Sequence, residues 1–266
     1  MEFRTIVDIE KPTFQIEPLE SVLLVGSCFA DRIGHRFKEE KFKAVVNPFG
    51  VMYNPASILH TIQRVEVVPR VVFLTLGTNH VYRLRETGEI VDNCEKRPSH
   101  LFQEEELTVG ECVDYLRQTV ELLREGNPEV KVVLTVSPIR YRKYGYHGSQ
   151  LSKATLLIAI AQLLPQFSDL FYFPAYEIVN DELRDYRFYA ADMLHPSEQT
   201  VDYIWERLLE TYFSKATHQF LTEWHPIRQA LDHRPFHPYS EDYKDFMDKT
   251  MNKINELKKK YPTFDL

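Results

Sequence analysis

The sequence of 266 residues predicts an α/β domain built on a parallel β-sheet, followed by a helical C-terminal extension. Three observations predict this fold class. Short apolar runs end at glycine, proline or small polar residues, longer segments with helical spacing separate these runs, and the pattern changes after about residue 215. Alternation of buried strands with helices is typical of βαβ units, which form parallel sheets.

Five apolar runs give the expected strands. They are residues 21–25, 43–46, 70–76, 131–136 and 170–173. The runs are apolar almost throughout, rather than at every second position, which indicates a sheet covered by helices on both faces. We therefore expect about five parallel strands.

Two segments carry apolar residues on one helical face. The first runs from Cys112 to Leu123 and the second from Val201 to Tyr212. Pro196 precedes the second helix, where proline suits a first turn. Residues 81–91 alternate around Glu86-Thr87-Gly88, which predicts a short hairpin.

The organisation predicted is a main domain over residues 1–215 and a helical extension over residues 216–266. Within the extension, residues 225–239 contain three prolines, and an amphipathic helix follows with Tyr243, Ile254 and Leu257 among its apolar residues. We expect this extension to pack on the main domain or on a partner.

Composition excludes several functional classes. Asp plus Glu number 39 against 32 for Lys plus Arg, a net charge of −7, which argues against a nucleic-acid binder. No run of eighteen apolar residues predicts a transmembrane helix, so no membrane partner is expected. Gly26 is followed only by Gly34, so the G-x-G-x-x-G fingerprint of dinucleotide binding is missing, and we expect no cofactor.

The three cysteines, Cys28, Cys94 and Cys112, form no C-x-x-C pair, which suits a reducing compartment and leaves at least one thiol free. With His100 they match no common zinc spacing, and no metal site is expected. Acidic residues lie near the N-terminus where a secretory leader would need an apolar run, so we expect a cytoplasmic protein, although a chain trimmed of its leader would look the same.

Candidate nucleophiles follow the first strand. Sites in open parallel sheets form beyond the carboxyl ends of strands, and there Gly26-Ser27-Cys28-Phe29-Ala30 leads into an expected helix. A hydroxyl or thiol at a helix N-terminus lies beside unpaired N–H groups and the positive end of the dipole, which favour a thiolate and can hold an oxyanion. The alternative interpretation makes Ser27 a helix cap and Cys28 a small core residue.

Further polar positions lie at other strand ends. Gly50 follows the second strand and Asn79 the third. A glycine N–H and an asparagine amide suit oxyanion donors, although both residue types are also common in turns. Asp192 and His195, three residues apart before the last helix, can place a carboxylate against one imidazole nitrogen and leave the other to accept a proton.

The pentapeptide at residues 26–30 is the namesake motif of the GSCFA family. Four blocks follow one another in the chain: the nucleophile loop, Gly50, Gly77-x-Asn79 and Asp192-x-x-His195. This order resembles that of the SGNH (GDSL-like) hydrolase superfamily. This resemblance implies a flavodoxin-like three-layer α/β/α fold and hydrolysis or transfer of O-acyl groups, often acetyl groups on carbohydrates. It also implies His195 as general base, Asp192 as its orienting acid, and Gly50 and Asn79 as oxyanion donors beside the nucleophile's own N–H.

The chain departs from the superfamily pattern at two positions. His80 stands where an aspartate commonly follows the asparagine. An ungapped match of Gly-x-Ser places Cys28 in the nucleophile position, whereas the superfamily's use of serine favours Ser27. The register gives the preference to Cys28, and a thiolate would favour thioester-type chemistry or acyl transfer.

The leading hypothesis is an SGNH-like esterase that cleaves a short O-acyl ester, with an acylated carbohydrate or another small ester as substrate. A Cys28-dependent acyltransferase or thioesterase is the second hypothesis, and a catalytically silent protein that binds a glycan or a protein is the third.

The loop of residues 139–147 carries cations and aromatic rings, so Arg140 is a candidate substrate contact, as is His80. The oligomeric state stays open.

Overall fold

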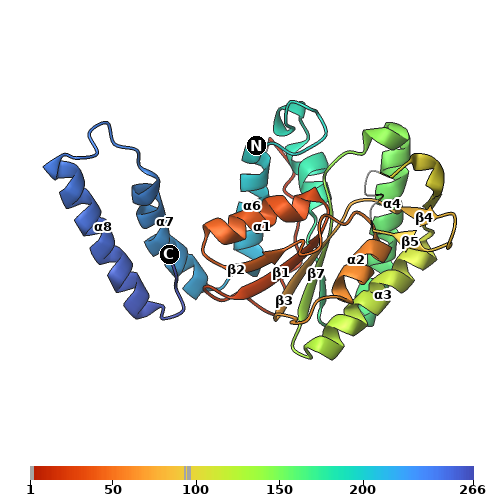
Figure 1. Ribbon diagram of the computed structural model, residues 1–266, viewed down its shortest axis with the longest axis horizontal. Helices are drawn as coiled ribbons and strands as arrows, with labels where there is room; N and C mark the ends of the chain where they lie inside the picture. The colour runs from red at the N-terminus through yellow and green to blue at the C-terminus, as the bar shows by residue number, and fades with distance from the viewer. Residues whose placement is uncertain (1–2, 93, 95–96) are drawn as a thin grey trace.

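The main domain has a central sheet with helices on both faces (Figure 1). The computed structural model describes residues 3–92, 94 and 97–266. The sheet order is β2-β1-β3-β7-β8, and every neighbouring pair is parallel, which confirms the predicted fold class. Its strands are β1 (Ser21–Gly26), β2 (Lys43–Val46), β3 (Val71–Leu76), β7 (Lys131–Val136) and β8 (Leu170–Tyr172).

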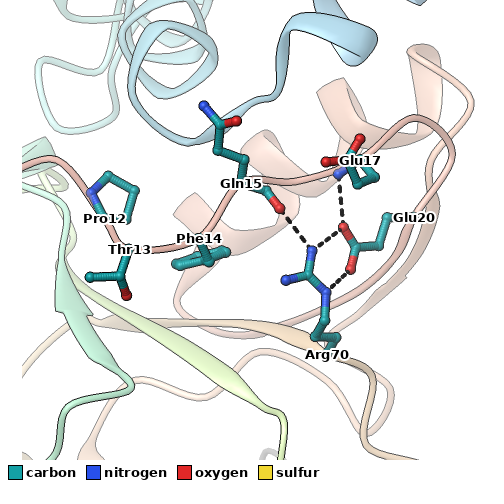
Figure 2. A pocket seen from close by; sticks show the side chains of 7 residues that line it. All are labelled: Pro12, Thr13, Phe14, Gln15, Glu17, Glu20 and Arg70. Atoms are coloured by element: carbon teal, nitrogen blue, oxygen red, sulfur yellow. Dashed lines mark hydrogen bonds and ion pairs between the residues drawn. The ribbon is translucent and has the colours of Figure 1, made fainter.

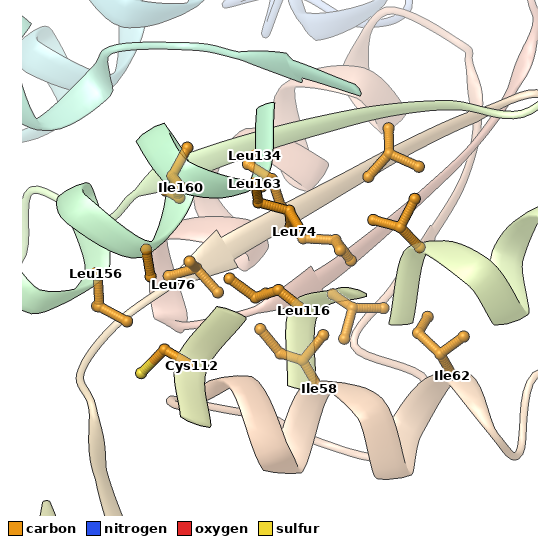
Figure 3. Packing of buried hydrophobic residues seen from close by; sticks show 14 of the residues in the cluster. Ile58, Ile62, Leu74, Leu76, Cys112, Leu116, Leu134, Leu156, Ile160 and Leu163 are labelled. Carbon is orange, nitrogen blue, oxygen red and sulfur yellow. The ribbon is translucent and has the colours of Figure 1, made fainter. Parts of the chain in front are cut away.

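Alternate side chains of these strands form two apolar cores. One core lies under α2 (Pro55–Ile62), α3 (Val109–Gly126) and α4 (Gly145–Leu163), where Leu74 and its neighbours pack against all three helices (Figure 3). The other lies under α1 (Cys28–Glu39) and α6 (Glu198–Tyr212) and is rich in aromatic rings around Phe37. Short helical segments cover Ser99–Leu101, Arg142–Tyr144, Leu164–Gln166, Ala175–Glu177, Ile178–Leu183 and Tyr186–Phe188.

Cys112 belongs to the first of these cores. Its side chain lies among Ile58, Leu76 and Leu116, and burial raises the pKa of its thiol to about 12 (Figure 3). Cys112 is therefore a packing residue. Within the described part of the chain, no group of three or more His, Cys, Asp or Glu side chains is arranged to hold a metal ion.

A second, three-stranded sheet follows β3. The predicted hairpin is confirmed as β4 (His80–Leu84) paired antiparallel with β5 (Ile90–Val91). A third strand, β6 (Phe102–Glu106), pairs with the other side of β4 and was not predicted. Because β6 is a polar edge strand with mostly exposed side chains, it has too few apolar residues for periodicity to reveal it.

The C-terminal extension is a pair of helices, α7 (Lys215–Asp232) and α8 (Glu241–Lys260); α7 lies next to the main domain and α8 packs on the outer side of α7 (Figure 1). Pro226 lies inside α7, so the proline-containing segment expected from residue 225 begins only after α7 ends at Asp232. Trp224 Nε1 donates to the carbonyl of Glu39 at 3.1 Å, and Arg228 Nη1 donates to the buried carboxylate of Glu40 at 2.5 Å. The domain boundary near residue 215 remains a prediction. In the described residues, no helix has both the length and the hydrophobicity needed to cross a lipid bilayer.

Lys153 of α4 is wholly buried beside the carboxyl ends of β3 and β7. Its Nζ donates to the carbonyls of Gly77 and Ser137, at 2.7 Å each. Burial removes water from the ammonium and lowers the pKa of Lys153 to about 7. The side chain therefore joins the two loops that leave these neighbouring strands.

Replacing Lys153 is expected to change both stability and its pH dependence. Lys153→Met leaves two buried carbonyls without a donor, which should lower the free energy of unfolding by about 2–5 kcal/mol near neutral pH. Between the folded pKa of about 7 and the reference value of 10.5, the unfolded chain binds more protons. Wild-type stability should therefore rise with pH over that range, by up to about 1.4 kcal/mol per pH unit.

Urea titrations of both proteins at pH 7 and pH 9.5 measure these effects. The stability difference between wild type and Lys153→Met should widen at pH 9.5, because only the wild type gains from losing the buried charge. A difference that stays constant or narrows would contradict the assigned state of Lys153.

Candidate active site

The end of β1 touches the end of β3 so closely that only glycine fits. Gly26 has a φ of +142°, and a Cβ at this position would lie 2.1 Å from the carbonyl oxygen of Thr75. Its N–H donates to Asn47 Oδ1 at 2.8 Å, and its carbonyl accepts from Met52 N–H at 2.8 Å. These contacts join β1, the loop after β2 and β3 at the point where the GSCFA motif begins.

Ser27 is fully buried and acts as the N-cap of α1. Its Oγ accepts from the N–H of Phe29 at 3.3 Å and lies 3.1 Å from Thr75 Oγ1. Its own N–H donates to the carbonyl of Thr75 at 3.0 Å. The hydroxyl therefore stabilises the helix start and points toward the sheet.

Cys28, the other candidate nucleophile, is the first residue of α1 and is partly exposed. Its Sγ lies 3.7 Å from Tyr53 Oη. The first N–H groups of a helix have no acceptor within it, so they can donate to an anion that forms beside Cys28. Of the two neighbouring side chains, Cys28 is the one that a substrate can reach.

Asp192 and His195 form a hydrogen-bonded pair in the loop before α6. Asp192 Oδ2 lies 2.6 Å from His195 Nδ1, and Asp192 Oδ1 accepts from the N–H groups of Leu194 and His195 at 2.9 and 3.0 Å. The backbone donors and then the imidazole hold the pKa of Asp192 well below its usual range. With Nδ1 occupied by the carboxylate, Nε2 is the ring nitrogen left for chemistry.

Ion pairs join α1 to α6. Arg32 pairs with Glu198, and one turn further along α1, Arg36 Nη2 contacts both Glu198 Oε2 at 2.8 Å and Asp202 Oδ1 at 2.7 Å. These contacts hold α1, which begins at Cys28, against the first two turns of α6, which begins three residues after His195.

The two predicted oxyanion donors have other partners. Gly50 N–H donates to the carbonyl of Asn47 at 2.9 Å in an exposed turn. Asn79 is 2% exposed, and its Nδ2 donates to the carbonyl of Leu107 at 2.8 Å, which ties the loop after β3 to the end of β6. Their catalytic role stays a prediction.

The two predicted substrate contacts line different pockets. His80 stacks on Tyr144, with ring centroids 3.6 Å apart, and borders a pocket of about 280 Å³. Burial lowers the pKa of His80. Arg140 borders a polar pocket of about 260 Å³ with Tyr186 and Tyr189, and it donates to the carbonyl of Met193 at 2.9 Å.

Another pocket, of about 640 Å³, lies at the opposite end of the sheet, next to the first residues of β1 and β3. Figure 2 shows its polar wall, where Arg70 donates to both carboxylate oxygens of Glu20, at 2.6 and 2.8 Å, and to the carbonyl of Gln15. Neither cysteine nor histidine is among the described residues that line it. None of the predicted catalytic residues lines this pocket, so its size does not make it the candidate active site.

Two tyrosines next to Cys28 were missed in the sequence. Tyr53 follows the turn at Gly50, and Tyr141 belongs to the predicted loop of residues 139–147. Both line the pocket that His80 borders. In the sequence, the composition of residues 139–147 marked Tyr141 as part of an aromatic loop. Nothing in the sequence singled out Tyr53, because a tyrosine before a helix is ordinarily a packing residue.

The fold places the chain in the class of GDSL-like (SGNH) hydrolase folds. A GDSL-like lipase described from Parabacteroides merdae superposes with a TM-score of 0.50 at 14% identity, over 75% of this chain and 100% of the other. A carbohydrate esterase of family 3 from Talaromyces cellulolyticus gives a TM-score of 0.43 at 13% identity, over 71% of this chain and 94% of the other.

The sequence profile of the GSCFA family matches residues 21–68 and 67–208, and the profile of the GSCFA domain protein, C-terminal domain, matches residues 224–266. The chain belongs to the GSCFA family. No curated protein sequence matches it significantly.

Ser27→Ala tests the separation of the two neighbouring side chains. Removal of an N-cap hydroxyl should lower the free energy of unfolding by about 0.5–2 kcal/mol, while the rate at which iodoacetamide alkylates Cys28 should change little. Urea titration and mass-spectrometric labelling kinetics measure the two quantities. A variant of undiminished stability with a strongly altered labelling rate would contradict the structural role of Ser27.

Proposed function

We propose that the chain hydrolyses a short acyl ester through a covalent S-acyl intermediate on Cys28. The observation that supports this proposal is that ion pairs join α1, which begins at the accessible Cys28, to α6, which begins three residues after the hydrogen-bonded Asp192–His195 pair. A thiol at a helix N-terminus that works with an oriented imidazole is suited to nucleophilic acyl transfer.

In the first half of the reaction, Cys28 Sγ attacks the acyl carbonyl carbon while its proton passes to His195 Nε2. The tetrahedral intermediate collapses, the bond to the alcohol oxygen breaks, and the alcohol leaves with the proton from His195. In the second half, His195 takes a proton from water as the water attacks the thioester. The acid then departs and Cys28 regains its proton.

Asp192 orients the base. Its Oδ2 accepts from Nδ1–H, which fixes the imidazole tautomer with Nε2 facing the reaction, and its negative charge stabilises the imidazolium that forms in each half. Because its pKa is held low by two backbone N–H groups, the carboxylate stays ionised under all ordinary conditions.

An acylated saccharide is the substrate class that the two pockets support. The pocket of about 280 Å³ beside Tyr53 and Tyr141 suits a short acyl chain. The pocket of Arg140, with Tyr186 and Tyr189 at its wall, offers the combination of aromatic faces and polar groups that binds sugar rings.

The decisive experiment compares Ser27→Ala, Cys28→Ala and His195→Ala on acetylated sugars and aryl acetates. Cys28→Ala and His195→Ala should lose at least about a hundredfold in kcat/KM, because nucleophile and base are removed, whereas Ser27→Ala should keep most activity. Turnover by Cys28→Ala equal to that of wild type would overturn the thiol mechanism.

The fate of the acyl group separates the alternatives. Free acid in stoichiometric yield supports hydrolysis, whereas transfer to an added alcohol or thiol would identify an acyltransferase. No turnover and no acylation of Cys28 by any member of the substrate panel would favour a silent binding protein over an enzyme.

Asp192→Asn tests the orienting role. The amide oxygen can still accept from the backbone N–H groups of Leu194 and His195, so the loop should persist, but the charge that supports the imidazolium is lost. We expect kcat to fall by about 10²–10⁴-fold with a small change in KM. Steady-state kinetics beside a thermal melt measure this, and a wild-type kcat in a folded variant would rule the role out.

A further inference from the structure

The oxyanion that forms when Cys28 attacks a carbonyl carbon needs hydrogen-bond donors close to the sulfur. The side-chain nitrogen of Asn79 and the N–H of Gly50 already donate to the carbonyls of Leu107 and Asn47. An acyl-transfer centre needs donors aimed at the carbonyl oxygen, commonly two or more. Tyr53, in contrast, has a hydroxyl beside Cys28 Sγ.

We propose that the hydroxyls of Tyr53 and Tyr141, together with the N–H of Cys28, form the oxyanion-binding site of this centre. This inference rests on the proposed function and names the groups that stabilise its transition state. Three observations support it: the position of Tyr53 beside Cys28, the surroundings of the Tyr141 hydroxyl, and the contacts that hold both rings in place.

Tyr53 lies directly against the nucleophile. Its Oη is 3.7 Å from Cys28 Sγ, a distance at which the hydroxyl also reaches a carbonyl oxygen bound to a carbon next to sulfur. Its backbone carbonyl accepts from the N–H groups of Gly77 and Thr78 at 2.9 and 2.8 Å, which fixes the residue at the carboxyl end of β3. Tyr53 is thus held by the sheet and not by a flexible loop alone.

Tyr141 presents an unused donor. Its Oη is buried and has no hydrogen-bond partner among the residues that the structure describes. A buried hydroxyl without a partner is costly to the folded state and is therefore uncommon outside binding sites. The Tyr53 and Tyr141 rings meet edge to face with centroids 6.1 Å apart, so both belong to one small group of rings lining the same pocket.

The glycine of the third motif block makes room for this hydroxyl. A Cβ on Gly77 would lie 2.3 Å from Tyr141 Oη, so any larger residue would displace the phenol. Lys153 Nζ, which binds the Gly77 carbonyl, lies 4.9 Å from the centroid of the Tyr141 ring and supports it from the buried side. Gly77 and Lys153 are positioning residues for the phenol.

Electrostatics keep both phenols protonated and able to donate. Burial, and then the neighbouring Cys28, raise the pKa of Tyr53 to about 12, and the same two causes raise the pKa of Tyr141. The two hydroxyls thus remain neutral donors near neutral pH. A phenol that donates to a developing negative charge needs no change of protonation state.

The test uses Tyr53→Phe, Tyr141→Phe and the double variant, with Tyr176→Phe as matched control. Tyr176 also lies near Lys153, 6.0 Å from its Nζ to the ring centroid, but it does not line the pocket that Tyr53 and Tyr141 share. Each substitution keeps the ring and removes one hydroxyl. The readouts are kcat and KM for an aryl acetate, the rate of Cys28 alkylation by iodoacetamide, and the melting temperature.

We expect kcat to fall by about 10–10³-fold in each single variant and further in the double variant, with KM changed less than threefold and Tyr176→Phe unaffected. Alkylation by iodoacetamide should keep its wild-type rate within about threefold, because displacement at a saturated carbon develops no oxyanion. Tyr141→Phe should melt no lower than wild type, since it removes an unpartnered buried hydroxyl.

Wild-type kcat in the double variant would overturn the inference while leaving the proposed function intact, provided that Cys28→Ala is inactive. A kcat loss matched by an equal loss of alkylation rate would also overturn it, because the phenols would then act on the thiol and not on the oxyanion. If the wild type neither turns over esters nor acylates Cys28, the proposed function itself fails.

Discussion

The contact between Gly26 and Thr75 is the constraint on which the rest of the site depends. Because Gly26 has no side chain, the end of β1 lies against the end of β3, and the next residue, Ser27, bonds to Thr75 through both its N–H and its hydroxyl. The first turn of α1 therefore starts at a fixed point over the sheet. Cys28 is presented to solvent there, while Asn47 and Met52 bring the loop after β2, and Tyr53 with it, to the same point.

Several buried polar groups stabilise the fold around the site, whereas the groups proposed to react are partly exposed. Ser27 caps a helix, Asn79 ties two loops together, and Lys153 joins the loops after β3 and β7. Each is almost completely buried and makes hydrogen bonds to backbone groups. The groups proposed to react, Cys28 and His195, are partly exposed, and the arginine ion pairs join the two helices that begin next to them.

Much of the fold could be predicted, because buried parallel strands leave continuous apolar runs and each expected run is a strand of the central sheet. The polar edge strand β6 and the helix around Pro226 left no such pattern and were missed. In the site, the short spacing of Asp192 and His195 predicted their hydrogen bond, since a three-residue separation confines the geometry. The hydrogen bonds that Gly50 and Asn79 make depend on how the loops fold and pack, so no spacing in the sequence reveals them.

By itself, then, the sequence determined the parallel α/β architecture, the family motif at residues 26–30 and the Asp192–His195 pair, because all three depend on local spacing or on burial averaged along a segment. Only the tertiary structure decided between Ser27 and Cys28 as the accessible group, since exposure depends on which way α1 leaves the sheet. It also brought Tyr53, Tyr141 and Lys153 together from the loop after β2, the loop after β7 and the interior of α4. Contacts among three segments so far apart in the chain are made by packing, which no pattern within one segment encodes.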